Sequence, residues 1–237
     1  LTGIPLTVEQ MDAVLPYLPS LTYVDMTDCG ISNEEMDALN GRYENIKIVW
    51  TVTLGKWYRT KTDITAFMPV KDDFYPSGND LYNLRYCHDL IAVDIGHRGV
   101  TNCQWAAYMP HLKYLIIADT YITDLTPLTG LKELVYLEVF MTSIRDFSPL
   151  VTLTGLEDLN LCYTRGDPEI IAQMTWLKNL WMIDCSTGAR YRMTQALPNT
   201  KVMVVGSATV PYLQQHPWGI RRKEKIDFVI ANGEHAT

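Results

Sequence analysis

The sequence predicts an α/β solenoid, a horseshoe-shaped stack of repeats with a curved parallel β-sheet on its concave face. Two observations predict it: a 22-residue period, and apolar positions in each unit that alternate around one exposed residue. A third is that helix-start signals fall between these apolar strings. With 237 residues, 47% hydrophobic and 11% aromatic, the chain has the composition of a folded protein.

One string of apolar and threonine positions recurs along the chain at offsets 0, 3, 5 and 8 of a unit, with a further apolar residue at offset 10 in several units. Three consecutive units carry it as follows: Leu112, Leu115, Ile117, Thr120 and Ile122; Leu134, Leu137, Val139, Thr142 and Ile144; Leu156, Leu159, Leu161 and Thr164. Further units begin at residues 21, 43, 90, 177 and 199. A ninth, degenerate unit is centred on Ile64 and Ala66.

Each offset has a physical role. Offsets 3 and 5 flank one exposed residue, which is the period of a half-buried strand, so successive strands should pair in parallel in one curved sheet. Offset 10 adds a core residue. At offset 8, where the chain leaves the strand, a threonine hydroxyl can hydrogen-bond nearby backbone. Cys29 and Cys185 occupy the same offset, and we expect them to be buried there rather than reactive.

The return segments predict structure of two lengths. Four segments begin with helix-start signals and should be true helices on the convex face: the capping boxes Thr7-x-x-Gln10, Ser32-x-x-Glu35 and Thr101-x-x-Gln104, and the N-cap and proline Asp167-Pro168. The shorter Asp-x-(Ser/Thr)-Pro-Leu strings at 124–128 and 146–150 predict 3₁₀ turns.

The pattern resembles the leucine-rich repeat family, L-x-x-L-x-L-x-x-(N/C/T)-x-L, over nearly the whole chain. Segments 122–128 and 144–150 resemble the convex segments of bacterial internalin-type repeats, and residues 21–55 resemble exported leucine-rich repeat proteins of gut Firmicutes. The departure is that Thr or Cys, rather than Asn, fills offset 8. The resemblance implies protein partners, export and a bacterial cell surface.

We expect one domain over 1–237. Residues 1–20 should form an N-terminal helical cap, 21–209 about nine repeats with an insertion near 54–89, and 210–237 a C-terminal cap, because an open end would expose the core. The run from Arg221 to Lys225 is interpreted as a solvated face rather than a phosphate or nucleic-acid site.

Side chains at offsets 2, 4, 6 and 7 should line the concave face. They bring together large apolar groups fringed by polar ones, which is typical of a recognition surface. The predicted ligand-binding residues are Tyr114, Tyr136, Glu138, Phe140, Met141, Asp158, Asn160, Tyr163 and Trp181. Tyr136, Phe140 and Trp181 are the expected anchors. Alanine at any of them should lower the affinity by about 1 to 3 kcal/mol with little loss of folding stability. The alternative is that the cap or the insertion packs on this face.

A His97–Asp119 pair lies in one column, with Asp94 nearby. Such a pair can act as a base, but no serine or cysteine falls in the adjacent concave positions to serve as nucleophile. We therefore interpret both as surface polar residues, and a hydrolase using them is a remote alternative.

Composition and cysteine spacing exclude several classes of partner and site. A net charge of −7 argues against nucleic acid as the main partner, and no apolar run is long enough to span a membrane. Five scattered cysteines without a C-x-x-C pair predict neither a zinc site nor a disulfide framework. No targeting segment is visible, although the chain starts at Leu1 and a precursor could have lost one.

These observations favour a non-enzymatic module that binds a protein, or alternatively a glycan, on its concave sheet, with no cofactor and no metal. A structural spacer within a larger surface protein is the second hypothesis. It would bind nothing itself.

Overall fold

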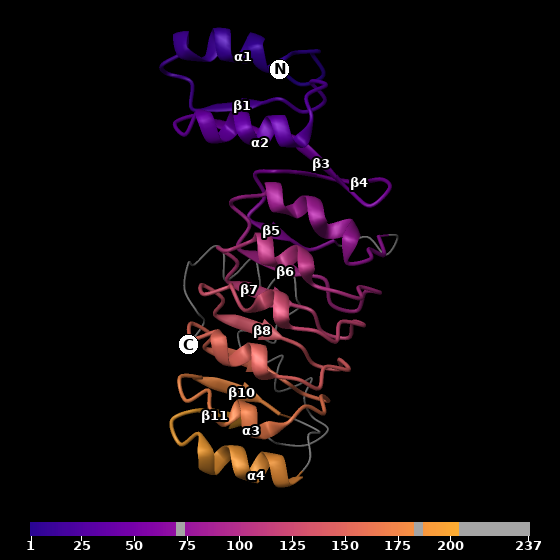
Figure 1. The fold of residues 1–237 in the computed structure, drawn as a ribbon, viewed down its shortest axis with the longest axis vertical. Helices are drawn as coiled ribbons and strands as arrows, with labels where there is room; N and C mark the ends of the chain where they lie inside the picture. Colours follow the sequence, from indigo (N-terminus) through magenta and orange to yellow (C-terminus); the bar gives the residue numbers. More distant parts are fainter. Residues whose placement is uncertain (70–73, 183–186, 204–237) are drawn as a thin grey trace.

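The repeats stack along the long axis of the molecule, from the N-terminal helix at one end to an orange helix at the other (Figure 1). The computed structural model describes residues 1–69, 74–182 and 187–203. The strands are β1 (Tyr23–Asp25), β2 (Lys47–Val49), β3 (Thr51–Leu54), β4 (Tyr58–Lys61), β5 (Ala66–Phe67), β6 (Ala92–Asp94), β7 (Tyr114–Ile116), β8 (Tyr136–Glu138), β9 (Asp158–Asn160), β10 (Asn179–Trp181) and β11 (Lys201–Met203).

The main sheet has seven parallel strands in the order β11-β10-β9-β8-β7-β6-β5. Its register matches the predicted repeat, since Tyr114 of β7 pairs with Tyr136 of β8, and Tyr136 with Asp158 of β9. The degenerate unit is confirmed, because Ala66 of β5 pairs with Ala92 of β6.

Short helices form the return segments. They are α1 (Val8–Val14), η1 (Leu15–Tyr17), α2 (Asn33–Arg42), η2 (Asn79–Tyr86), η3 (Gln104–Tyr108), η4 (Thr126–Leu128), η5 (Ser148–Thr152), α3 (Pro168–Ile171) and α4 (Thr187–Ala196), where η denotes a 3₁₀ helix. The capping boxes that open α1 and α2 are both formed, and Asp167 caps α3. The two predicted 3₁₀ turns, η4 and η5, are confirmed.

The helix expected after Thr101 is wrong. The backbone N–H of Gln104 donates to the Asn102 side chain at 3.3 Å, so Thr101 does not cap it. Cys103 precedes the first helical residue and makes no side-chain cap, and the segment is the 3₁₀ helix η3.

The turn that follows each strand is built in the same way in successive repeats. The hydroxyl of Thr120 donates to the carbonyl of Ile117 at 2.7 Å, and Thr142 and Thr164 make the equivalent bond in their own repeats. This confirms the predicted role of offset 8. Cys29 is buried at that offset, and its thiol donates to the Leu1 carbonyl at 3.1 Å.

The core runs the length of the solenoid between the sheet and the convex segments. Leu115, Leu137 and Leu159 occupy the same position in three adjacent strands and have no exposed surface. Each repeat therefore buries its apolar side chains against its neighbours, as expected for a stack in which no unit has a closed core.

The expectation of one continuous sheet is wrong. β1 and β2 form a separate two-stranded parallel sheet, and the antiparallel hairpin β3–β4 lies between it and β5. In Figure 1 this hairpin projects sideways from the stack. The chain enters the hairpin at Trp50, whose carbonyl accepts a hydrogen bond from the N–H of Thr62 at 2.9 Å. Among the described residues, β2 therefore pairs in parallel only with β1, and its other edge has no parallel partner.

The register of the second repeat also differs from expectation. Tyr23 pairs with Lys47, not with Asn45, so the unit begins two residues later than predicted. A shift of two residues keeps the same side chains on the same face, because side chains alternate along a strand. Trp50 thereby takes the offset-5 core position and is 3% exposed.

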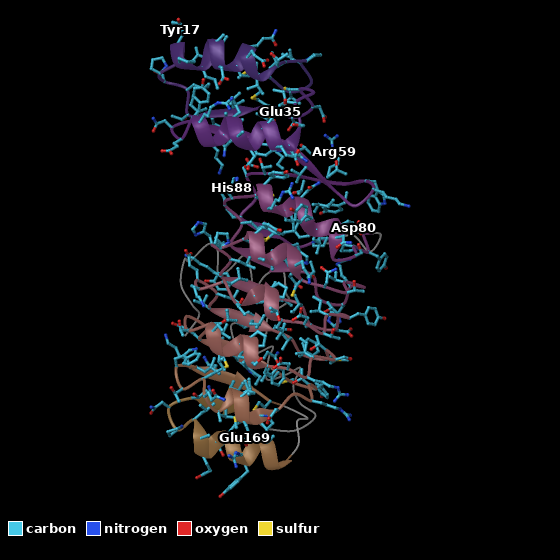
Figure 2. The ribbon with its side chains drawn as sticks, viewed as in Figure 1. Tyr17, Glu35, Arg59, Asp80, His88 and Glu169 are labelled. Atoms are coloured by element: carbon cyan, nitrogen blue, oxygen red, sulfur yellow. The ribbon has the colours of Figure 1, made fainter. Side chains whose placement is uncertain are left out.

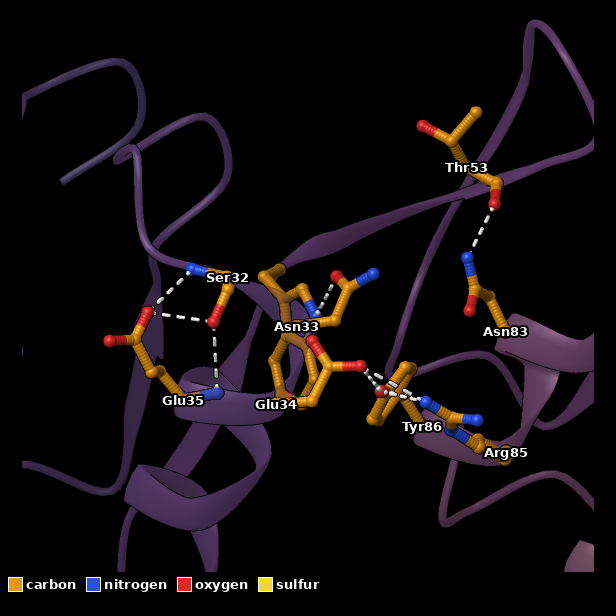
Figure 3. Close-up of polar contacts among 9 residues, drawn as sticks. Ser32, Asn33, Glu34, Glu35, Thr53, Asn83, Arg85 and Tyr86 are labelled. Atoms are coloured by element: carbon orange, nitrogen blue, oxygen red, sulfur yellow. Dashed lines mark hydrogen bonds and ion pairs between the residues drawn. The ribbon is translucent and has the colours of Figure 1, made fainter.

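Polar contacts join the first two repeats to the rest of the stack (Figure 3). Glu34 of α2 accepts hydrogen bonds from the hydroxyl of Tyr86 at 2.7 Å and from Arg85 at 3.1 Å. The hydrogen bond from Tyr86 holds the pKa of the Glu34 carboxyl below its usual value. Nearby, His88 lies 2.6 Å from Asp37, and Figure 2 places His88 between Glu35 and Asp80 along the stack.

Some predictions concern residues outside the described ranges. These are the C-terminal cap at 210–237 with its basic run, Cys185, and residues 70–73 of the insertion. The domain boundaries stay a prediction. No helix of the described residues is both long and apolar enough to cross a bilayer.

Replacing Leu137 by alanine should lower the free energy of unfolding by about 2 to 5 kcal/mol, because it opens a cavity in the middle of the shared core. Urea denaturation followed by circular dichroism measures the change. Exposed Thr123→Ala is the control and should stay within about 0.5 kcal/mol of the parent. Equal stability of both variants would contradict a core shared at this position.

Asp25→Asn should destabilise the N-terminal repeats in a pH-dependent way. The ion pair with Lys61, on hairpin strand β4, lowers the pKa of Asp25 to about 2 in the folded protein. A carboxyl with a depressed folded pKa stabilises above its unfolded pKa of about 4 and loses that contribution as pH falls through 2. Parent and variant should therefore differ by about 1 kcal/mol at pH 7 and converge between pH 4 and 2 in denaturation series.

Candidate interaction surface on the concave face

A second apolar cluster, separate from the solenoid core, lies on the concave face of the main sheet. We call it the concave cluster; its buried members are Ala92, Tyr114, Ile116, Ala118, Tyr136, Cys162, Trp181 and Met203. Every one of them lies in a strand or within two residues after one. The cluster follows from strand alternation, which sends every second side chain of β6 to β11 to the side opposite the solenoid core.

The structure brings the predicted anchors together, but their side chains are less exposed than expected. Tyr136 and Trp181 are 2% and 1% exposed, and Tyr114, Glu138, Asp158 and Asn160 are buried as well. The prediction that these side chains line an open sheet is therefore wrong.

Polar groups of the cluster are ordered by local hydrogen bonds. The hydroxyl of Tyr136 donates to Glu138 at 2.7 Å, two residues along the same strand, and the Asn179 side-chain amide donates to Asp158 at 2.7 Å across adjacent strands. Asn160 accepts the backbone N–H of Cys162 at 3.0 Å. Burial raises the pKa of the Tyr114 phenol, and the acidic neighbours Glu157 and Asp158 act in the same direction.

Beside the cluster, the residues at offset 7 form an exposed edge that we call the rim column. Its members, all non-glycine residues with φ between 51° and 59°, are Asp28, His97, Asp119, Met141 and Tyr163. Left-handed backbone of this kind costs on the order of 1 kcal/mol per residue. It is held by the inter-repeat ladder, since the N–H of His97, Asp119 and Met141 each donate to a carbonyl of the next repeat at 2.8 to 3.0 Å.

The predicted binding residues that reach solvent lie at this rim. Met141 is 49% exposed and Tyr163 is 38% exposed, while Phe140 is half-buried. A groove beside them is lined by Met141, Thr142, Ser143, Ile144, Arg145, Tyr163 and Arg165. It combines two apolar side chains with two exposed guanidinium groups.

The structure confirms that His97 and Asp119 are adjacent, with Nδ1 and Oδ2 2.7 Å apart. Both side chains are about half exposed, and His97 packs edge-on against Phe140 at 5.9 Å between ring centres. An exposed pair of this kind is what a surface interpretation expects.

Within the described ranges, no group of three or more His, Cys, Asp or Glu side chains is placed to hold a metal ion. The four described cysteines, Cys29, Cys87, Cys103 and Cys162, are free thiols and buried. Burial raises the pKa of Cys87 and Cys103 to about 12, which suppresses the reactive thiolate.

Two features of this surface escaped the sequence analysis. The left-handed backbone of the rim column has no glycine signal, because five different residue types occupy it. Arg145 lies at offset 11 of its repeat and Arg165 at offset 9 of the next, so the repeat pattern does not align them. In the structure both line the same groove. The recurring threonine at offset 8 is the sequence feature that could have indicated a tight turn at offset 7.

Burial corrects one expectation about the anchors. Trp181→Ala should lower the free energy of unfolding by about 3 to 5 kcal/mol, because it empties a fully buried site. Little loss of stability was expected from the sequence. Thermal or urea denaturation measures the change, with exposed Tyr191→Ala as the control; Tyr191 is 71% exposed. A Trp181→Ala variant as stable as the control would restore the open-sheet interpretation.

Comparison with known proteins identifies a fold and no close relative. No protein-family model matches the chain, and no curated protein matches it. Among solved structures, a leucine-rich repeat protein of Leptospira interrogans is 16% identical with a TM-score of 0.51, covering 84% of this chain and 52% of its own.

Two Listeria monocytogenes internalins are also similar. Internalin C2 is 18% identical with a TM-score of 0.43, covering 62% of this chain and 76% of its own. A second internalin is 16% identical with a TM-score of 0.43, covering 67% of this chain and 55% of its own. The chain thus spans only about half the length of this internalin and of the Leptospira protein. The 22-residue parallel repeat, its convex 3₁₀ segments and the Leptospira structure together show that the fold is a leucine-rich repeat solenoid.

Proposed function

We propose that this chain is a non-enzymatic protein-binding module that recognises a polypeptide along the rim of its concave face. The observation that carries the proposal is the pair of exposed apolar side chains, Met141 and Tyr163, held on left-handed backbone beside a groove. Strained backbone that the surrounding structure holds in place tends to accompany function.

The chemistry of the groove favours one kind of ligand segment. Met141 and Tyr163 offer apolar surface, and a tyrosine presents a large rigid contact area at low conformational cost. Arg145 and Arg165 are exposed cations at the same groove. A segment with an apolar side chain followed by a carboxylate would satisfy both, since guanidinium groups bind carboxylates through two parallel hydrogen bonds.

The other predicted binding residues form the floor behind this rim. These six residues, all buried, offer little surface to a ligand: Tyr114, Tyr136, Glu138, Asp158, Asn160 and Trp181. Phe140, half-buried between floor and rim, would be reached first. This division supports the rim as the place where recognition starts.

The biological setting is part of the same proposal. The resemblance of segments 122–128 and 144–150 to internalin-type repeats supports a bacterial exported or cell-surface protein, and that of residues 21–55 supports an origin among gut Firmicutes. A protein ligand is favoured over a neutral glycan because the groove offers two cations, which a neutral sugar leaves without a counter-charge. A spacer would need no exposed apolar groove, so Met141 and Tyr163 favour binding over that alternative. The half-exposed His97–Asp119 pair gives the hydrolase alternative no added support.

Met141→Ala combined with Tyr163→Ala should weaken ligand binding by about 1 to 3 kcal/mol, roughly 5- to 150-fold in Kd. The fold should persist because both side chains are substantially exposed. The assay is affinity capture from bacterial-surface and mucosal extracts, followed by calorimetry on the purified partner. Circular dichroism would confirm that parent and variants are equally folded.

Tyr121→Ala is the matched control. Tyr121 is 73% exposed but lies at offset 9, beyond the turn and outside the groove. It should bind like the parent. A partner that binds the double variant and the parent with one affinity would remove the rim from the proposal, and failure of the parent to retain any partner would favour the spacer.

A further inference from the structure

The free edge of strand β2 opens into a cleft of about 440 Å³. The residues that line this cleft come from α2 and the turn after it, from β2, from the residues that follow β4, and from the end of η2. His88, one of them, is labelled in Figure 2. The volume lies within the range of about 300 to 1,000 Å³ that is usual for ligand sites. The cleft thus lies where the parallel sheet is interrupted.

β2 uses only one of its edges to pair with β1. The N–H of Lys47 donates to the carbonyl of Thr22, and the carbonyl of Val49 accepts from the N–H of Met26. Successive residues of a strand direct their backbone groups to opposite edges. The N–H and carbonyl of Ile48 therefore face the other edge, where Ile48 lines the cleft.

On this second edge the hydrogen-bond donors are satisfied and the acceptors are open. The N–H of Ile48 donates to the side-chain oxygen of Asn40 at 3.1 Å, and the N–H of Trp50 donates to the hydroxyl of Thr62 at 3.2 Å. Within the described part of the chain, no hydrogen bond is made to the carbonyls of Ile46 and Ile48, and both residues line the cleft. The edge is therefore suited to a ligand that brings N–H groups.

The charged side chains of the cleft are mostly acidic. Glu44, Asp63 and Asp89 line it, and Lys47 is the only lysine or arginine among its described lining residues. Asp89 forms an ion pair with Lys47, and Asp63 accepts from the Tyr23 hydroxyl at 3.0 Å. Three carboxylates against one ammonium leave a net charge of −2, with histidine neutral. The cleft therefore favours a cationic ligand.

An apolar wall lies beside these acceptors and acids. It is formed by the buried residues Ile46, Ile48, Trp50 and Tyr86. An arginine side chain suits such a combination, because its methylene stem packs on apolar surface while its guanidinium binds a carboxylate through two parallel hydrogen bonds. A lysine ammonium lacks that paired geometry.

We propose that this cleft binds an extended, arginine-containing segment of a partner protein. The N–H groups of the segment donate to the carbonyls of Ile46 and Ile48, which adds a strand at the interruption of the sheet. Its guanidinium groups lie among the three carboxylates. Addition of a strand to a free sheet edge is a general mode of peptide recognition. The site is separate from the groove at the rim of the concave face, and it stands whether or not the rim binds a ligand.

Three matched peptides test the proposal on the intact chain. The probe is a capped Val-Arg-Val-Arg-Val peptide, in which valine favours the extended state. Citrulline in place of both arginines keeps the shape and removes the charge, and methylation of alternate backbone nitrogens keeps the charge and removes the donors. Each change should weaken binding at least about 10-fold in calorimetry, because each removes hydrogen bonds to the cleft.

Nuclear magnetic resonance locates the bound probe. The amide signal of Val49 should shift on titration, since its N–H shares a peptide group with the carbonyl of Ile48. No binding of the arginine peptide, or equal binding of either matched peptide, would overturn the proposal. So would reversible dimerisation of the peptide-free chain that Gly41→Trp abolishes, because the occupant would then be a second copy.

Two variants of the chain place the binding in the cleft. Gly41 lies in α2 and lines the cleft, and a Cβ added there meets no atom within 4 Å. Gly41→Trp should therefore fold, since most residues favour a helix more than glycine does, while its indole fills part of the cleft. Glu44→Gln with Asp63→Asn removes two of the cleft charges. Each variant should bind the arginine peptide at least about 10-fold more weakly than the parent.

Glu133→Gln with Glu169→Gln is the matched control. It removes two exposed carboxylates from other repeats, outside the cleft, and should bind the arginine peptide like the parent. Circular dichroism checks that every variant is folded. If Gly41→Trp is not, the charge variant decides: parent-like affinity in Glu44→Gln with Asp63→Asn overturns the proposal, and a loss confined to that variant and absent from the control supports it.

Discussion

The inter-repeat ladder of backbone hydrogen bonds is the constraint on which the rest of this structure depends. Each strand of the main sheet is only two or three residues long, far too short to be stable by itself. Bonds such as Ile117 to Glu138 and Val139 to Asn160 tie each strand to the next at 2.9 to 3.0 Å. Burial of the shared leucine core follows from this stacking, and neither would exist for one repeat alone.

The same ladder also creates the exposed surface. It continues past the strand ends, where the N–H groups of His97, Asp119 and Met141 donate to the following repeat. The threonine hydroxyls close the turn behind them. These bonds hold the left-handed backbone at His97, Asp119 and Met141. The side chains of the rim column are thereby fixed in one row along the edge of the concave face.

The concave face is consequently divided into two zones. The rim is open and carries Met141, Tyr163 and the two arginines of the groove. The floor is closed around Tyr136 and Trp181. The rim is therefore the part of this face that a ligand can reach without rearrangement of the buried side chains.

The sequence by itself determined the repeat, its register in the main sheet and the identity of the core, because strand alternation and a 22-residue period leave one consistent assignment. It also determined the caps of α1, α2 and α3, which are local interactions. Tertiary structure decided what depends on distant neighbours. It broke the sheet at the β3–β4 hairpin, turned the segment after Thr101 into a 3₁₀ helix, and buried six of the nine residues expected to bind. Offsets show which face a side chain points to, but whether another segment covers that face is set by long-range packing.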